Sequence, residues 1–255
     1  MKAVILAAGK GTRMRDLTQE VPKPMLRVHG KPILQHIVDG LAATGIREIC
    51  IITGWRAEVI ERHFGDGAPY GVHVTYARQE VQDGTGRAPE YAKAFVGKDD
   101  FLLTYGDILV KPETYGKMVR RFESGPFDGV ITVTVGEDVT QGGLNFFDRD
   151  FCLTRLVEKP STAQVEALRT EGLLQAGQPL YYNAGIYIFR PSVYGFTSRL
   201  EKSPRGEYEL TDAVSMMLAE GQRIAGLQIE GRWVDVRDPE VLERLERGED
   251  PARSG

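Results

Sequence analysis

The sequence predicts an α/β fold with a mainly parallel central sheet flanked by helices. Short β-branched runs alternate with amphipathic stretches through the first half of the chain, and a glycine-rich loop follows the first run directly. Strand–helix–strand alternation is typical of parallel sheets, because each connection between parallel strands must cross over the sheet. The composition supports a substantial core, since 42% of the 255 residues are hydrophobic and 27% are charged.

In the first half, strands are expected where β-branched runs are bounded by glycine or charge, at residues 4–7, 49–53, 72–76 and 101–105. Helical periodicity predicts helices at residues 32–43, 57–64 and 88–95, with Pro32 in the first turn. Ligands of such sheets bind beyond the carboxyl ends of the strands. The loops after Ala7, Arg78 and Tyr105 are therefore expected to form the site.

The second half has a more mixed pattern. Residues 128–135 and 182–189 are predicted strands, and residues 144–158 a bent strand or hairpin. Helices are expected at residues 163–170, 211–220 and 241–247, with Thr211 or Asp212 as the cap of the second. Residues 248–255 are expected to be a frayed tail. With no repeat and no low-complexity linker, one compact domain is expected.

Charge and termini narrow the classes of function. The formal net charge is −4 and the pI is about 5.7, which argues against a nucleic-acid partner. The apolar run at the N-terminus is too short for a signal segment or a membrane span, so a cytoplasmic location and no membrane partner are expected. Cys50 and Cys152 have no metal-site or disulfide spacing and are expected to be buried free thiols.

The glycine-rich loop directly after the first strand is the first candidate site. Small residues and glycines let a backbone approach a ligand closely, and their N–H groups can hold phosphate oxygens. Met14 stands where a dinucleotide-binding fingerprint requires its third glycine, and the phosphate-loop pattern of the ATPases and GTPases is absent. The loop residues proposed to bind nucleotide are Leu6, Ala8, Gly9, Gly11 and Thr12.

Two cations follow the loop in positions that suit a triphosphate. Arg13 lies two residues after Gly11, and Lys23 is held between Pro22 and Pro24, which stiffen the backbone around it. A guanidinium and an ammonium beside a backbone anion site can neutralise a polyphosphate. Arg13 and Lys23 are therefore the predicted catalytic residues.

This segment, residues 6–26, resembles the signature of the sugar-1-phosphate nucleotidylyltransferases, in which Gly-x-Gly-Thr-Arg-x-x-x-Leu-Thr precedes Pro-Lys-Pro. Asp16 stands where that signature usually has a proline. The resemblance implies a Rossmann-like nucleotidyltransferase fold with a mixed sugar-binding lobe. It further implies a single domain at residues 1–247, with a nucleotide-binding half at about 1–110 and a sugar-binding half at about 111–247.

Further family elements recur in order along the chain. The resemblance implies nucleobase recognition by Gln79, Gly84 and Thr85, and metal binding by Asp107 and Asp235. It implies that the sugar phosphate is bound by Gly143, Glu158, Lys159 and Asn183, although Gly142 could replace Gly143. Taken singly, an aspartate after a strand or a glycine before a helix has a simpler explanation as a turn or cap. The joint occurrence of these residues favours a site.

The resemblance implies transfer of a nucleoside monophosphate from a nucleoside triphosphate, UTP or dTTP, to a sugar 1-phosphate with Mg²⁺. Products would be a nucleotide sugar and pyrophosphate. Alternatives are a cytidylyl- or guanylyltransferase acting on a cyclitol, heptose or choline phosphate, and a non-catalytic regulatory relative. The sugar and the oligomeric state, a homo-oligomer included, stay open from the sequence.

Overall fold

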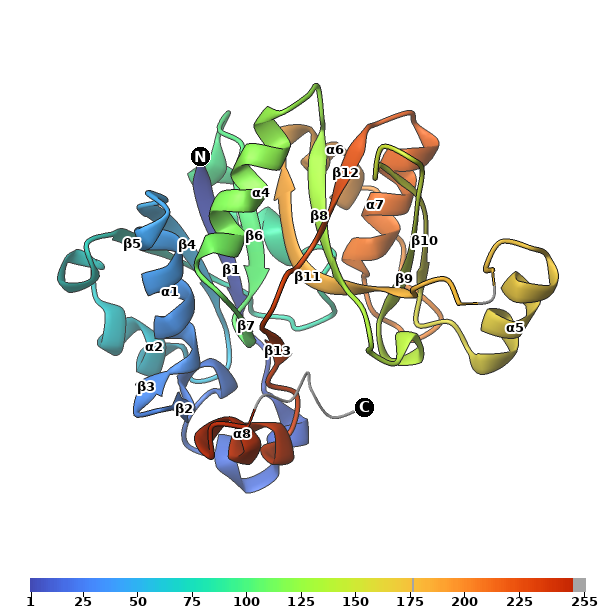
Figure 1. The fold of residues 1–255 in the computed structure, drawn as a ribbon. Helices are drawn as coiled ribbons and strands as arrows, with labels where there is room; N and C mark the ends of the chain where they lie inside the picture. The colour runs from blue at the N-terminus through green and yellow to red at the C-terminus, as the bar shows by residue number, and fades with distance from the viewer. Residues whose placement is uncertain (176, 250–255) are drawn as a thin grey trace.

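The computed structural model describes residues 1–175 and 177–249, which are built around one nine-stranded sheet (Figure 1). Its main strand order is β10-β9-β11-β6-β1-β4-β5, while β8 pairs with β11 and β12 pairs with β8. The nine strands are β1 Lys2–Ala7, β4 Glu48–Thr53, β5 His73–Arg78, β6 Phe101–Tyr105, β8 Gly129–Thr134, β9 Gly143–Phe147, β10 Leu153–Glu158, β11 Tyr181–Phe189 and β12 Ile224–Gln228.

The first half of the sheet is parallel, as predicted. Strand β1 lies between β4 and β6, and Val4 is opposite Cys50 on one side and Leu103 on the other. The second half is mixed because β11 runs antiparallel to β6, β8 and β9. The predicted hairpin at residues 144–158 is present as the antiparallel pair β9–β10. The α/β fold class is therefore confirmed.

Helices cover both faces of the sheet (Figure 1). One apolar core includes side chains of α1, α2 and α4, and the other includes side chains of α3, α6 and α7. The central strands β1, β4 and β6 are mostly apolar because both of their faces are covered. The helices are α1 Ile33–Ala43, α2 Ala57–Phe64, α3 Lys93–Val96, α4 Glu113–Glu123, α5 Thr162–Thr170, α6 Tyr194–Thr197, α7 Leu210–Ala219 and α8 Pro239–Glu246.

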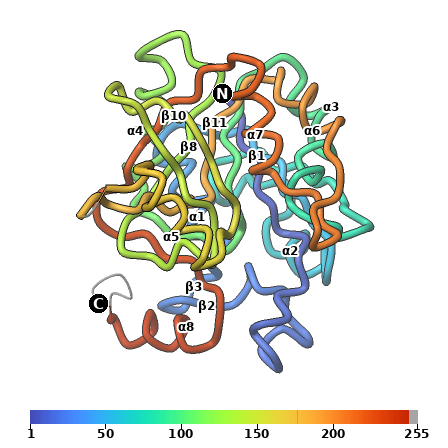
Figure 2. The backbone as a smooth tube through the Cα atoms, turned by 90° about the vertical axis from the view of Figure 1, so that its right-hand side faces the viewer, coloured from blue at the N-terminus to red at the C-terminus, as the bar shows by residue number. Residues whose placement is uncertain are grey.

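Helix α8, the last helix of the described chain, lies below the sheet against segments that follow β1. Helix α8 contacts the short strand β2 (Arg27–Val28), which pairs with β3 (Lys31–Pro32), and the 3-10 segment η1 (Thr12–Thr18). Figure 2 shows α8 beside this N-terminal segment. A second short pair, β7 (Ile108–Val110) with β13 (Trp233–Asp235), joins the middle of the chain to its end.

The structure also differs from the sequence prediction in several elements. Helix α4 and strands β7, β12 and β13 had not been predicted, and the predicted helix at 88–95 is a 3-10 segment, Ala88–Ala92, followed by α3. The prediction of a Thr211 or Asp212 cap is wrong. Helix α7 begins at Leu210 after Glu209, without a side-chain cap.

The cysteines and the C-terminal residues complete the comparison of the fold with the sequence prediction. Cys50 is buried as expected, whereas Cys152 is only half-buried, and both are free. Of the predicted tail, residues 250–255 lie outside the described part of the chain. Within the described part, no helix has both the length and the hydropathy that a membrane crossing requires.

Candidate active site

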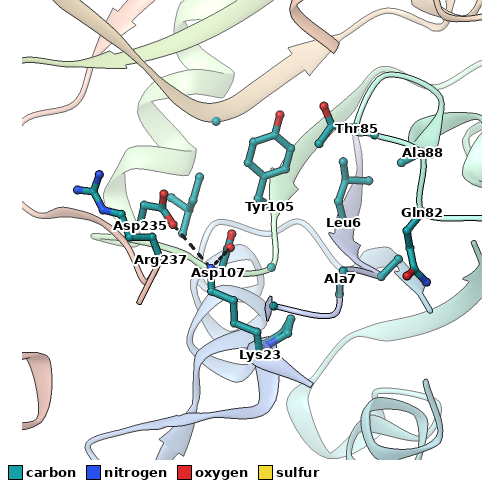
Figure 3. A pocket seen from close by; sticks show the side chains of 18 of the residues that line it. Leu6, Ala7, Lys23, Gln82, Thr85, Ala88, Tyr105, Asp107, Asp235 and Arg237 are labelled. Atoms are coloured by element: carbon teal, nitrogen blue, oxygen red, sulfur yellow. Dashed lines mark hydrogen bonds and ion pairs between the residues drawn. The ribbon is translucent and has the colours of Figure 1, made fainter. Parts of the chain in front are cut away.

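A cavity of about 500 Å³ opens at the carboxyl ends of β1 and β6 (Figure 3). All three loops predicted from the sheet topology contribute to its wall. Of the sixteen residues predicted for the site, thirteen line the cavity: Leu6, Ala8, Gly9, Gly11, Thr12, Arg13, Lys23, Gln79, Gly84, Thr85, Asp107, Asn183 and Asp235. The structure therefore brings residues from both halves of the chain to one place.

The glycine-rich loop follows β1 and wraps one side of the cavity. Gly11 has a φ of 63°, and a Cβ at this position would lie 2.8 Å from the Cβ of Lys23. Glycine is therefore required both for the left-handed backbone and for the close approach of Lys23. Trp55 fixes the loop at both ends, because its backbone N–H donates to the Ala8 carbonyl at 3.1 Å and its indole Nε1 donates to the Thr18 carbonyl at 3.2 Å.

Lys23 reaches two carboxylates across the cavity. Its ammonium lies 2.6 Å from Asp107 Oδ2 and 4.0 Å from Asp235 Oδ1, and its side chain is only 13% exposed. Figure 3 shows the three side chains meeting beside the glycine-rich loop. A single cation is thus shared by two acidic groups that would otherwise repel each other.

The short β7–β13 pair explains why the two aspartates are neighbours. Asp107 immediately precedes β7, and in the antiparallel register Asp235 lies opposite Ile108. The Val236 N–H also donates to the Asp107 carbonyl at 3.0 Å. The indole of Trp233 donates to the Ala184 carbonyl at 2.9 Å, which holds β13 against β11. These contacts join residues 128 positions apart in the sequence.

The acidic pair has an unfavourable electrostatic environment. Burial and the neighbouring Asp107 carboxylate raise the pKa of Asp235 to about 6, against the opposing effects of Lys23 and Arg237. Carboxylate oxygens are the protein ligands that Mg²⁺ prefers, and it usually takes one or two of them while phosphates of a substrate and waters complete its shell. Among the described residues no group of three or more acidic, histidine or cysteine side chains could hold a metal. Two carboxylates that need a cation therefore fit a metal bound jointly with a phosphate ligand.

The segment predicted to read the nucleobase lies at the opposite end of the cavity from the acidic pair. Gln79 is buried, and its amide donates to the Val81 carbonyl at 3.1 Å, which fixes the side-chain orientation. Gly84 has a φ of 118° and is bridged to Tyr208, whose backbone oxygen would lie 2.3 Å from a Cβ at position 84. A glycine is thus required here by close backbone packing.

Only one of the four predicted sugar-binding residues lines the cavity. Asn183 lines the cavity, and its Oδ1 accepts from the Gly185 N–H at 3.1 Å. Gly143, Glu158 and Lys159 lie outside the cavity lining. Gly143 packs against Asn183 and near the Glu158 carboxylate, so these two adjoin the cavity, whereas the Lys159 side chain is exposed. Burial raises the pKa of Glu158, and Arg205 lies 3.5 Å from its carboxylate.

Sequence reasoning did not identify several residues that line the cavity. Five of them lie within two positions of a predicted site residue, namely Gln82, Tyr105, Tyr182, Trp233 and Arg237, whereas Glu207 has no predicted site residue near it in the sequence. Tyr105 could have been found because it ends a strand directly before Gly106 and Asp107. Arg237 lies two positions after Asp235, but only the path of the chain beyond β13 places it at the cavity.

A glycine-rich loop, the fixed Lys23 ammonium and an acidic pair at the carboxyl edge of the parallel half of an α/β sheet are the arrangement expected of a nucleotide-dependent transferase. A sequence profile of the family described as Nucleotidyl transferase matches residues 2–247. The chain belongs to this family.

Individual relatives agree with the family profile. The chain is 37% identical over 243 residues to the low-salt glycan biosynthesis nucleotidyltransferase Agl11 of Haloferax volcanii, covering 95% of this chain and 64% of Agl11. It is 30% identical over 249 residues to the UTP–glucose-1-phosphate uridylyltransferase AglF of the same organism, covering 97% and 96%. A Bacillus anthracis structure described as a glucose-1-phosphate thymidylyltransferase, in complex with sucrose, superimposes with a TM-score of 0.80 at 24% identity, covering 100% of this chain and 97% of that one.

Proposed function

We propose that this cavity joins a nucleoside triphosphate to a sugar 1-phosphate and releases pyrophosphate and a nucleotide sugar. The observation that carries the proposal is the convergence of the glycine-rich loop, Lys23 and the Asp107–Asp235 pair in one cavity that also contains Asn183. The relative AglF is named for UTP and glucose 1-phosphate, and the similarity to it supports a nucleoside triphosphate and a sugar 1-phosphate as the substrate classes here.

The proposed chemistry is an in-line displacement at the α-phosphorus. A phosphate oxygen of the sugar 1-phosphate forms a bond to this phosphorus, and the bond from the phosphorus to the β-phosphate oxygen breaks with its electron pair. The attacking phosphate is already ionised at neutral pH, so no general base is needed. Catalysis then consists of positioning and charge stabilisation.

Residues of this chain supply both the positioning and the charge stabilisation. The backbone N–H groups of the loop around Gly9 and Gly11 hold phosphate oxygens, and Arg13 and Lys23 neutralise the triphosphate. Lys23 is held in place by its 2.6 Å contact with Asp107. Such preorganisation avoids reorganisation during the reaction, which is the main source of electrostatic catalysis.

Asp107 and Asp235 would hold the divalent cation, Mg²⁺, that we assign to this reaction. When bound, this ion neutralises phosphate charge and polarises phosphoryl oxygens. Both carboxylates already lie within 4.0 Å of a shared ammonium, so the position favours positive charge.

Nucleobase recognition is assigned to Gln79. Its amide donates one N–H to Val81, which leaves Oε1 as an acceptor and one further N–H as a donor. A uracil or thymine edge presents a matching N–H and carbonyl oxygen, so UTP or dTTP is the proposed nucleotide. In this assignment residues of about 1–110 bind the nucleotide, and residues of about 111–247 bind the sugar.

Pyrophosphate release tests the proposal, measured with a panel of nucleoside triphosphates and sugar 1-phosphates, with and without Mg²⁺. We expect metal-dependent release with a pyrimidine triphosphate and one sugar 1-phosphate. Pyrophosphate release only with a cyclitol, heptose or choline phosphate would show that this compound, and not a sugar 1-phosphate, is the acceptor. No release from any pair, despite nucleotide binding, would point to a regulatory relative.

A further inference from the structure

The turn between β4 and α2 lies beside the glycine-rich loop, although the two segments are distant in the sequence. One residue of this turn, Trp55, contacts the loop at three points and lies outside the cavity lining. We propose that Trp55 is a positioning residue for the triphosphate, which holds the loop in its phosphate-binding shape without touching the substrate. The inference rests on the proposed function, in which the N–H groups of this loop hold phosphate oxygens.

The loop has little packing of its own. Residues 9–13 are exposed or half-buried, whereas Ala8 and Met14 on either side are buried. The Met14 N–H and the Thr18 hydroxyl both donate to the Gly11 carbonyl, at 2.8 and 3.2 Å, and these bonds order the second half of the loop. The first half contains two glycines, which have more conformational freedom than any other residue. Its shape therefore depends on contacts from outside the loop.

Trp55 supplies three such contacts. Its backbone N–H donates to the Ala8 carbonyl at 3.1 Å, directly after β1. The Lys10 ammonium lies 5.2 Å from the centroid of the indole ring, which is within the range of a cation–π interaction. The indole Nε1 donates to the Thr18 carbonyl at 3.2 Å, at the end of η1. One residue thus fixes the start of the loop, the segment between its two glycines and its end.

Trp55 is itself held by its neighbour and by the sheet. The guanidinium carbon of Arg56 lies 5.5 Å from the centroid of the indole ring, and its Nη2 donates to the Gln19 carbonyl at 3.4 Å and to the Glu20 carboxylate at 3.1 Å. The turn follows β4, whose last residue pairs with the last residue of β1. The turn and the loop therefore leave adjacent strands at the same edge of the sheet, so the sheet fixes their distance.

The effect of Trp55 should be specific to the triphosphate. Arg13 lies between Lys10 and Thr18, so its guanidinium and the loop N–H groups shift together when the contacts with Trp55 are lost. A displacement of about 1 Å at a charge-stabilising group can cost about a hundredfold in rate. The sugar side of the cavity is formed by other elements, β11 and β13, and it should keep its geometry.

Two variants of Trp55 test the inference. Trp55→Phe removes the indole N–H but keeps an aromatic face for Lys10, and it should lower kcat/KM for the nucleoside triphosphate about 3- to 10-fold. Trp55→Leu removes both contacts and should lower it about 10- to 100-fold. The KM for the sugar 1-phosphate should change less than about twofold in either variant. Calorimetric titration with inorganic triphosphate does not depend on turnover, and its Kd should rise in the same order.

Tyr70→Phe is the matched control. The Tyr70 hydroxyl donates to the His63 carbonyl at 3.1 Å, and Tyr70 lies outside the cavity lining. This variant removes the same kind of bond as Trp55→Phe, from an aromatic side chain to a backbone carbonyl. It should lower the urea concentration at the unfolding midpoint about as much as Trp55→Phe does. The Kd for inorganic triphosphate and the kcat/KM for the nucleotide should stay at the wild-type values.

The outcomes separate the inference from the proposed function. Absence of pyrophosphate release by the wild type with every substrate pair would overturn the proposed function, while the triphosphate titration would still test Trp55. Folded Trp55 variants that bind inorganic triphosphate as tightly as the wild type would overturn the inference, because Trp55 would then have a structural role only. An equal rise of the KM values for the nucleotide and the sugar 1-phosphate would overturn it as well. So would a wild type that does not bind inorganic triphosphate.

Discussion

Replacing Asp235 by asparagine should stabilise the protein in the absence of metal while it strongly lowers activity. The amide has nearly the same shape as the carboxylate but carries no charge, so it removes the repulsion from Asp107 and the cost of burying an ion. Activity should fall on the order of a hundredfold or more, because the proposed metal loses a ligand. Exchange of one carboxylate oxygen for an amide nitrogen would then raise stability and lower activity.

The size of the stabilisation follows from the pKa. Burial and Asp107 raise the pKa of Asp235 from 3.8 to about 6. Since one pKa step corresponds to about 1.4 kcal/mol, the ionised carboxylate destabilises the fold by at most about 3 kcal/mol. A carboxyl with a raised folded-state pKa contributes stability that is fully present below pH 3.8 and is lost as the pH rises to 6. The advantage of the variant should therefore be complete above pH 6 and absent below pH 3.8.

Urea unfolding in EDTA at pH 8 and at lower pH measures this difference. Asp39→Asn is the matched control, because Asp39 pairs with Lys31 at 2.7 Å in a partly exposed surface pair and should change stability by only about 0.5 kcal/mol. Added Mg²⁺ with nucleotide should stabilise the wild type more than the variant. A variant no more stable than the wild type at pH 8 would refute the electrostatic reasoning, and a fully active variant would refute the metal-ligand role.

The remaining predictions concern the nucleotide side of the cavity. Arg13→Ala should lower turnover about a hundredfold, and circular dichroism should show that the fold is intact. Arg15 lies outside the cavity lining, so Arg15→Ala should leave turnover unchanged. Equal activity of the two variants would show that Arg13 has no catalytic role. Gln79→Leu should lower kcat/KM for the preferred pyrimidine triphosphate about tenfold or more, and an unchanged ranking of nucleotides would contradict base reading by this amide. Gly84→Ala should lower the unfolding free energy by about 2–4 kcal/mol in denaturant titrations, because its Cβ would overlap the Tyr208 backbone. An unfolding free energy equal to that of the wild type would show that the backbone of Tyr208 can move aside at little cost.

Much of the nucleotide side of the molecule was accessible from the sequence. Strand β1, the glycine-rich loop and Lys23 are contiguous within 22 residues, and their chemistry depends mainly on local backbone conformation. Strands β1, β4 and β6 were predictable because most of their residues are apolar and buried. Helix α4 had a usable signal as well, since Tyr115, Met118 and Phe122 are buried at helical spacing.

The fold class and the position of the glycine-rich loop could be read from the sequence alone, because each depends on neighbouring residues. Which distant groups meet depends on how the strands pair in three dimensions. Asp235 joins Asp107 through the three-residue pair β7–β13, which is too short to give a periodic signal. Arg237 reaches the cavity because of the same pairing, and Lys159 stays outside it. Charges act over a few ångströms in space, so their partners are set by strand pairing and not by sequence order.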